Sequence, residues 1–309
     1  MSVIQACLLV FFAPLVQGVI KHTKAWMQGR KGPSVWQPYR ELRKYFRKGT
    51  VLSDQSSLVT TVVPYLQLAL VFMAAMMLPV VTAASHTLLA SSDIFLFIYL
   101  LGFARLLTAV VGMDSGSAFG GMGISRDLFI SLLVEPTVFL AILATGIAAN
   151  IYSFSGLSTQ LLSHPVEEFT LTHLLAAVAL FMIVMTEVGR LPIDNPDTHL
   201  ELTMIHEAAV LDLSGRHIAL MSLGAWMRQL LWFTVFLDVC VPAGMASGLT
   251  VSGILLGVVV WIGKVFVLGT MLAALESVNA KMRLFAVPRF LTFALSIAVF
   301  ALLTNFVAV

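Results

Sequence analysis

Long apolar stretches separated by short polar segments run through the whole chain. Eight of them approach the roughly 20 residues that a helix needs to cross a bilayer. The expected spans cover about residues 2–20, 59–84, 93–112, 128–152, 171–189, 223–243, 250–275 and 288–309. Continuous runs such as AVALFMIVM contradict the alternating pattern of a membrane β-barrel. The pattern therefore predicts an all-α polytopic membrane protein in which residues 1–309 form a single integral membrane domain.

Composition supports this class, since 59% of the residues are hydrophobic, 11% are charged and the mean hydropathy is +0.95. A soluble domain carries about 25% charged residues. The first apolar stretch has the length of a signal peptide, but no basic segment precedes it and no small-residue cleavage motif follows it. It is interpreted as a retained helix.

Basic residues predict the orientation, because short cytoplasmic loops hold an excess of Lys and Arg. Nine of the 18 Lys and Arg residues lie between Lys21 and Lys48. With this loop inside, the outer loops hold no basic residue at all. Both termini are then expected outside the cytoplasmic (inner) membrane. The cytoplasmic loops at about 21–58, 113–127 and 190–222 are candidate docking segments for peripheral subunits.

The basic loop contains an amphipathic stretch after its Gly-Pro break. Five apolar or aromatic residues recur there at near-helical spacing, namely Trp36, Tyr39, Leu42, Tyr45 and Phe46. Such a helix is expected to lie along the membrane interface. An ordinary positive-inside loop explains it as well as the docking of a peripheral subunit does, and both interpretations stay open here.

An acidic loop follows the fifth span, in the segment TEVGRLPIDNPDTHLELTMIHE. Glu187 and Arg190 are three residues apart and are expected to pair on one helical face before Pro192 ends the helix. The further ionisable residues of this region are Asp194, Asp197, His199, Glu201, His206, Glu207 and Asp212. Clustered carboxylates near a low-dielectric region favour proton exchange near neutral pH. A divalent metal site is the competing interpretation, although the spacing matches no standard ligand motif.

Charged residues within the spans continue the row of ionisable side chains into the membrane. An intramembrane charge is costly and by default marks a pathway or an ion pair. Glu135 directly precedes Pro136, and Arg105 is its expected partner. The other such residues are Arg228, Asp238, Lys264 and Glu276. Arg228 and Asp238 are ten residues apart on one helix and must each find a partner elsewhere. Any one of these charges could simply fix the register between two helices. The whole set together favours a continuous row of polar side chains across the membrane.

Known catalytic signatures do not occur in the chain. It has no Walker-type glycine loop, no dinucleotide fingerprint after a strand and no nucleophile elbow. Cys7 and Cys240 are too few for an iron–sulfur cluster, which needs about four ligands. No cofactor or metal bound by this chain is expected, and whatever energy the protein uses is expected to come from elsewhere.

Two loop motifs resemble the NADH dehydrogenase subunit 1 (complex I subunit 1) family. GRKGPSVWQPYRELRK is similar to its Arg-x-Gly-Pro…Gln segment, and EVGRLPIDNPDTHLELTMIHEAAVLDLSGRH to its Glu-x-x-Arg-x-Pro…Ser-Gly segment. VEP around Glu135 and GKVFVLGTMLAALESVNAKMRLFAVP continue the match in family order over nearly the whole chain. Within the family, the chain most resembles the membrane subunit of energy-converting group 4 nickel–iron (NiFe) hydrogenases, of the formate hydrogenlyase subunit 4 or hydrogenase-4 component C type.

This resemblance implies a non-catalytic membrane anchor that seats a peripheral redox arm and relays redox energy to proton or sodium translocation. The implied partners are hydrogenase large and small subunits, an iron–sulfur protein, antiporter-like membrane subunits and the lipid bilayer, with no nucleic acid. The NiFe centre and the iron–sulfur clusters would lie in those partners. The implied coupling residues are Glu135, Glu187, Asp194, Glu201, Asp212 and Glu276. The implied cavity and docking residues are Arg30, Gly32, Pro33, Gln37, Arg190 and Pro192.

Departures from the respiratory pattern bear on the electron acceptor. Respiratory relatives have a denser glutamate run where this chain has Asp197, His199 and Glu201, and they tend to carry arginine at the position of Glu276. The loop between Pro33 and Gln37 is also shorter here. These differences favour the hydrogenase branch over a quinone-reducing dehydrogenase of the complex I type. A stand-alone secondary transporter is the alternative of another class, but no internal repeat relates the two halves of the chain.

Overall fold

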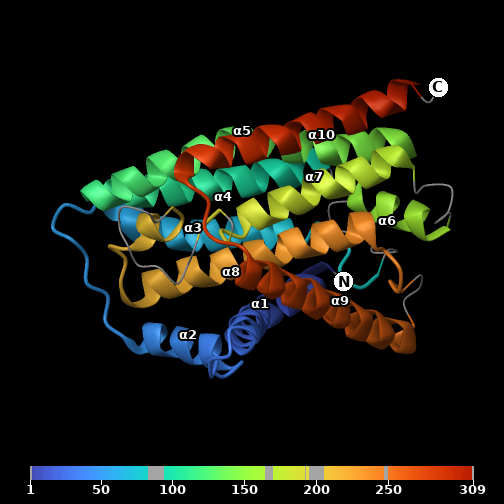
Figure 1. The fold of residues 1–309 in the computed structure, drawn as a ribbon. Helices are drawn as coiled ribbons and strands as arrows, with labels where there is room; N and C mark the ends of the chain where they lie inside the picture. The colour runs from blue at the N-terminus through green and yellow to red at the C-terminus, as the bar shows by residue number, and fades with distance from the viewer. Residues whose placement is uncertain are drawn as a thin grey trace.

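The computed structural model describes residues 2–82, 94–163, 170–191, 193–194, 205–246 and 250–307 (Figure 1). The helices in these ranges are α1 (Ser2–Met27), α2 (Gln37–Arg47), α3 (Leu58–Ala75), α4 (Ile94–Asp114), α5 (Ala118–Ala149), α6 (Phe154–Ser163), α7 (Leu171–Glu187), α8 (Gly215–Cys240), α9 (Val251–Val278) and α10 (Val287–Val307). Two short 3-10 turns, η1 (Glu207–Val210) and η2 (Leu284–Ala286), complete the described elements. The all-α prediction is therefore confirmed.

Each of the eight predicted spans coincides with a helix. Seven of these helices are long and apolar enough to cross a membrane, and they are α1, α3, α4, α5, α8, α9 and α10 with its preceding turn. The eighth, α7, is apolar and has 17 residues. That length lies at the lower limit for a membrane-spanning helix. The amphipathic stretch of the basic loop is also helical, as α2.

Several predicted helix ends were wrong. α5 begins at Ala118 rather than near residue 128, because the Ser117 hydroxyl caps it by accepting a hydrogen bond from the Gly120 amide at 3.1 Å. Most of the expected docking loop 113–127 is consequently helix. α8 likewise begins at Gly215, inside the expected loop 190–222. α3 ends at Ala75, several residues before Pro79, rather than near residue 84.

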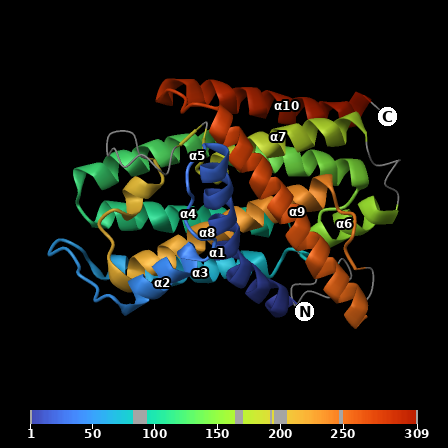
Figure 2. The same cartoon turned by 60° about the horizontal axis from the view of Figure 1, so that its bottom comes forward.

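The bundle has two distinct ends, which are clear in both views (Figures 1 and 2). The α2 end carries α2, the loop between α2 and α3, and η1. The α6 end carries α6, the start of α1 and the end of α10. α10 packs on α5 and α7, and α3 packs on α4 and α8. α1 and α9 pack on each other and lie obliquely to the remaining helices.

At the α6 end, the start of α1 is tied to two connections. The Gln5 side chain donates to the Thr82 hydroxyl at 3.1 Å and accepts from the Val80 amide at 2.8 Å. Thr82 in turn forms an isolated bridge with Ala246, beyond the end of α8. The first helix is therefore attached to chain that follows both α3 and α8.

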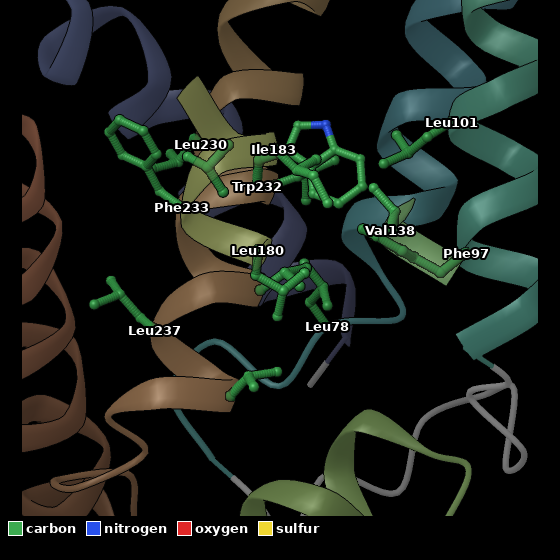
Figure 3. Packing of buried hydrophobic residues seen from close by; sticks show 14 of the residues in the cluster. Leu78, Phe97, Leu101, Val138, Leu180, Ile183, Leu230, Trp232, Phe233 and Leu237 are labelled. Atoms are coloured by element: carbon green, nitrogen blue, oxygen red, sulfur yellow. The ribbon is translucent and has the colours of Figure 1, made fainter. Parts of the chain in front are cut away.

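The largest apolar cluster runs through most of the bundle, and Figure 3 shows the part of it around α4, α5, α7 and α8. Phe97 packs edge-on against Trp232, with ring centroids 6.0 Å apart, and against Phe154 at 5.2 Å. Val138 and Ile183 complete the contact from α5 and α7 and are at most 2% exposed. In lipid, such close packing rather than exclusion of water holds helices together. The cluster fixes the end of α7 against α4 and α8.

The turn η1 packs into the angle between α4 and α5. Gly123 permits this approach, since a Cβ at that position would lie 2.3 Å from the Cβ of Ala208. A larger residue at position 123 would push η1 away from α5. The close contact brings His206, which directly precedes η1, onto the surface of α5.

Candidate functional site

Arg105 and Glu187 form a buried ion pair between α4 and the end of α7. One guanidinium nitrogen of Arg105 donates to Glu187 Oε1, and another donates to the Ser131 hydroxyl at 2.8 Å. Trp232 Nε1 of α8 donates to Glu187 Oε2 at 3.1 Å. The side chains of Arg105 and Glu187 are only 7% and 4% exposed. Both carboxylate oxygens of Glu187 are thus satisfied, as a buried charge requires.

This arrangement corrects two predicted pairs. Glu187 was expected to pair with Arg190, but Glu187 is the last residue of α7, and Gly189 then turns the chain with a φ of +62°. Arg190 therefore does not continue the helical face of Glu187. Arg105 was expected to bind Glu135, but it turns toward Glu187, which lies across the helix contact.

Arg190 instead joins a second buried group around Glu276 of α9. Arg190 Nη1 donates to Glu276 Oε1 at 3.2 Å, and Nη2 donates to the side-chain oxygen of Gln17. Lys24 Nζ of α1 lies 3.1 Å from Glu276 Oε2, but off the direction of a hydrogen bond, so this contact is chiefly electrostatic. The carboxylate of Glu276 thereby connects α1, α9 and the segment after α7.

Asp194 holds the acidic loop to the region before α10. Its Oδ1 accepts from Lys281 Nζ at 2.8 Å, while its Oδ2 accepts from the backbone amides of Ile205 and His206 at 3.2 and 3.4 Å. Asp194 is 4% exposed. The contacts position His206 beside α5.

His206 faces Asp127 of α5, with Nδ1 at 2.9 Å from Oδ1. This short contact sets the imidazole ring against the carboxylate. Burial acts to lower the pKa of His206, but attraction by the Asp127 carboxylate outweighs it and leaves the pKa above the ordinary value. Gly189 leaves room for the ring, because a Cβ there would lie 2.4 Å from His206 Cδ2.

We refer to these side chains together as the buried charge cluster, which comprises Lys24, Arg105, Asp127, Glu187, Arg190, Asp194, His206, Glu276 and Lys281. Two adjoining cavities reach it from the α2 end. A cavity of about 120 Å³ is lined by Glu187, Arg190 and Asp194 among others. A larger one of about 500 Å³ extends between α1, α2, α3 and α8. Gln17, Trp226 and Arg228 line both.

Arg228 lies where the two cavities meet. Its side chain lines both cavities and makes no hydrogen bond or salt bridge to any described residue. The sequence required a partner for Arg228 away from Asp238. Among the described residues, Glu187 and Asp127 attract it electrostatically without contacting it directly.

Glu135 lies near the middle of α5 and is exposed on the surface of the chain. Its side chain lies against Gly102 of α4, whose Cβ position is 3.6 Å from Glu135 Oε1. A small cavity of about 20 Å³ is lined by Glu135, Arg105 and Glu187 together. The carboxylate thus lies beside the buried charge cluster but opens to the outside of the bundle.

The remaining predicted coupling and docking residues lie near the surface or outside the described ranges. Asp212 is exposed and accepts from the Ser117 hydroxyl at 2.6 Å, apart from Glu187 and Asp194. Arg30, Gly32, Pro33 and Gln37 belong to the segment between α1 and the start of α2, and none of them lines the 500 Å³ cavity. Pro192 and Glu201, like Asp197 and His199, fall outside the described residues.

Sequence reasoning missed Asp127, Ser131 and Trp232. Asp127 was assigned to a loop, although Asp127, Ser131 and Glu135 are spaced at four-residue intervals, which places them on one helical face. That signal becomes visible once α5 is known to start at Ala118. No local pattern identifies Trp232, because its indole nitrogen gains a role only from the position of α7.

A family model described as NADH dehydrogenase matches residues 1–307. The chain belongs to the NADH dehydrogenase family. Formate hydrogenlyase subunit 4 of Escherichia coli (strain K12) is 31% identical to it over 286 residues, which cover 93% of this chain and 92% of that protein. Hydrogenase-4 component C of the same organism is 30% identical over 279 residues, which cover 90% and 87%. The resemblance inferred from the loop motifs is confirmed.

Among solved structures, a chain of the membrane-bound sulfane sulfur reductase, an archaeal respiratory membrane complex, has the same fold. The TM-score is 0.80 at 20% sequence identity, with 99% of this chain and 100% of that chain covered. Together with the apolar helices, these matches establish a multi-pass membrane protein of the NADH dehydrogenase family.

Proposed function

We propose that the chain is the membrane-anchor and coupling subunit of a group 4 hydrogenase or formate hydrogenlyase-like complex. It would seat the peripheral redox arm and relay redox energy through buried carboxylates to proton or sodium translocation. The two Escherichia coli relatives, which match this chain over nearly their whole length, support the hydrogenase assignment. The expected membrane is the cytoplasmic (inner) membrane, with the α2 end inside and both termini outside.

The observation that carries this proposal is the continuity of the buried charge cluster. It begins at cavities that open at the α2 end and contains Asp127, His206 and Glu187 in turn. It ends beside Glu135, at the outer surface of α5. A change of charge at the cavity can therefore alter the protonation of carboxylates deeper in the bundle, since closely spaced buried charges interact strongly.

The redox cofactors belong to the partners in this proposal. Clusters and NiFe centres are held by several thiolates, whereas this chain has Cys7 in α1 and Cys240 at the end of α8. That donor set does not fit such a group. The expected partners at the α2 end are hydrogenase large and small subunits and an iron–sulfur protein, docked on the basic loop and α2.

An antiporter-like membrane subunit is the expected partner on the α4–α5 face. Glu135 is exposed there at mid-helix, surrounded by exposed apolar side chains such as Leu132 and Phe103. A carboxylate facing lipid at this depth is unfavourable, so intramembrane charges face protein or water instead. A photo-reactive amino acid at Leu132 is expected to cross-link to another membrane subunit, and cross-links to lipid alone would contradict this assignment.

Purification in mild detergent through a tag on this chain tests the identity of the complex. Hydrogenase subunits and stoichiometric nickel would support the proposal. Similar partners without nickel would instead favour a quinone-reducing dehydrogenase of the complex I type. The 500 Å³ cavity is large enough to hold the head group of a quinone. Recovery of the chain alone would overturn both and favour a stand-alone transporter.

Glu187→Gln tests the coupling role. The amide keeps one of the two acceptor oxygens, and Asp127 remains to attract Arg105, so the complex is expected to assemble and retain its redox activity. Formation of an ion gradient in vesicles is expected to be lost. Asp54→Asn, which removes an exposed carboxylate between α2 and α3, is the matched control and should pump normally. Undiminished pumping by Glu187→Gln would show that the cluster is structural.

A further inference from the structure

A second buried carboxyl group lies apart from the buried charge cluster, toward the α6 end of α8. Asp238 is 2% exposed, and its Oδ2 atom is fully buried without a hydrogen-bond partner among the described residues. Thr234, one turn earlier on the same face, donates its hydroxyl proton to Leu230 O at 2.9 Å. It is therefore not available as a donor to Asp238.

Lys264 of α9 is close enough to attract Asp238 electrostatically, yet the two form no salt bridge in the described structure. The ammonium group of Lys264 instead donates to the carbonyl oxygen of Val241, at 2.6 Å, and to that of Ala243. These carbonyls follow the end of α8, where the helix dipole also favours a positive charge. Lys264 thus caps α8 and leaves Asp238 without its counter-ion.

Few other ionisable groups face this region. His173 of α7 contacts the carbonyl oxygen of Val239 with its Nε2, at 2.6 Å. α6 has no ionisable side chain, α3 has Tyr65 alone, near its α2 end, and α1 has only the Cys7 thiol in the half that lies at the α6 end. α2 packs against the opposite end of α8. Among the residues that the structure describes, Lys264 is therefore the cation that attracts Asp238.

An ionised Asp238 does not fit this geometry. A buried carboxylate with an unpartnered oxygen is strongly unfavourable, and such a group binds a proton instead. Were Asp238 ionised, the flexible stem of Lys264 would allow the ammonium group to leave two neutral carbonyls for a charged partner, which forms the stronger hydrogen bond. The observed arrangement is the one expected for a neutral carboxylic acid.

We propose that Asp238 is held protonated in this state and is the proton-exchanging group of the α6-end half of the subunit, with Lys264 as its mobile counter-ion. When the O–H bond of Asp238 breaks, the proton passes to water at the α6 end. The Lys264 ammonium then leaves the carbonyls of Val241 and Ala243 and neutralises the carboxylate. Reprotonation returns it to the end of α8. This role extends the proposed coupling function and rests on it.

Infrared spectroscopy of the purified complex at neutral pH tests the protonation state directly. The wild type is expected to show a carbonyl band of a protonated carboxylic acid that shifts in heavy water and is lost in Asp238→Asn. Asp54→Asn is the control and should retain the band. Absence of the band from the wild type would overturn the inference. This readout does not depend on nickel or on pumping. The inference about Asp238 can therefore fail while the proposed function stands, and the proposed function can fail while Asp238 is protonated.

Pumping measurements test the exchange of the proton. Asp238→Asn and Lys264→Met are both expected to abolish the ion gradient while redox activity and assembly persist, because the first variant cannot release a proton and the second cannot stabilise the anion. Asp238→Glu is expected to restore part of the gradient. Should Asp238→Asn pump normally, Asp238 would be a static neutral group and the proposal would be wrong.

Discussion

The ion pair between Arg190 and Glu276 provides a quantitative test of how the buried charge cluster contributes to stability. Glu276 is 1% exposed and neutralises two cations, Lys24 and Arg190. Glu276→Met would leave both cations buried without this carboxylate. Removal of one member of a buried pair costs about 3–5 kcal/mol. At 1.4 kcal/mol per factor of ten, the ratio of folded to unfolded protein should fall roughly a hundredfold to several thousandfold.

Arg190→Met is expected to cost less, because Lys24 still neutralises Glu276. The loss of its hydrogen bonds to charged and neutral acceptors amounts to about 1.5–3 kcal/mol. Gln17, the second acceptor, lines the 120 Å³ cavity, so water can replace the guanidinium there. The double variant Arg190→Met/Glu276→Met removes one charge of each sign. It should therefore be more stable than the sum of the single effects by about 0.5–3 kcal/mol.

Unfolding of the chain by sodium dodecyl sulfate in mixed micelles, followed by tryptophan fluorescence, measures these free energies. Lys281→Met is the comparison variant, because the Lys281 side chain is 25% exposed at the rim of the cluster and water can reach the charge that the substitution leaves on Asp194. Its loss should therefore cost less than the loss of Glu276, which is 1% exposed. The reasoning would be refuted if Glu276→Met cost no more than Lys281→Met, or if the two single effects simply added in the double variant.

Further predictions concern the contacts around His206. The pKa of His206 is raised in the folded state, so its pairing with Asp127 stabilises the folded chain. This contribution is complete at a pH below the ordinary histidine pKa of about 6.5 and is lost as the pH rises through the raised pKa. Thermal unfolding against pH should show this decline in the wild type and a flatter profile in His206→Gln. Gly189→Ala should cost more than about 1 kcal/mol, since its φ is +62° and the new Cβ would meet the His206 ring. Gly263→Ala, in the middle of α9 with open space around it, should be neutral or slightly stabilising, and equal effects would contradict the steric argument. Gly123→Leu should displace η1 from α5 and lower the yield of folded chain, as assayed by size-exclusion chromatography in detergent.

The class of fold and most of the spans follow from the sequence, because a long apolar stretch in a membrane has few alternatives to a helix. The intramembrane charges could be singled out for a related reason, since each is costly unless it has a partner or a function. Helix ends were predicted less well. The Ser117 cap that starts α5 outweighs the unfavourable helix propensity of three nearby glycines, and hydropathy alone does not detect this cap.

The partners of the charges could not be predicted, because they depend on packing between distant segments. Arg105 and Glu187 are 82 residues apart, and Arg190 and Glu276 are 86 apart. Local spacing instead favoured Glu187 with Arg190. Gly189 turns the chain between Glu187 and Arg190 and so separates their side chains. The sequence indicates this turn only after α7 is known to end at Glu187.

The attachment of α1 has a consequence for biosynthesis. Gln5 is made well before Thr82, which binds its side chain, and before Ala246, which bridges Thr82; α9, against which α1 packs, is made later still. A ribosome must therefore synthesise most of the chain before the first helix can dock. Until then the insertion machinery or a chaperone has to shield Gln5 and Lys24 from the hydrocarbon region. Truncation before α9 should leave a chain whose first helix is recognised by quality-control proteases.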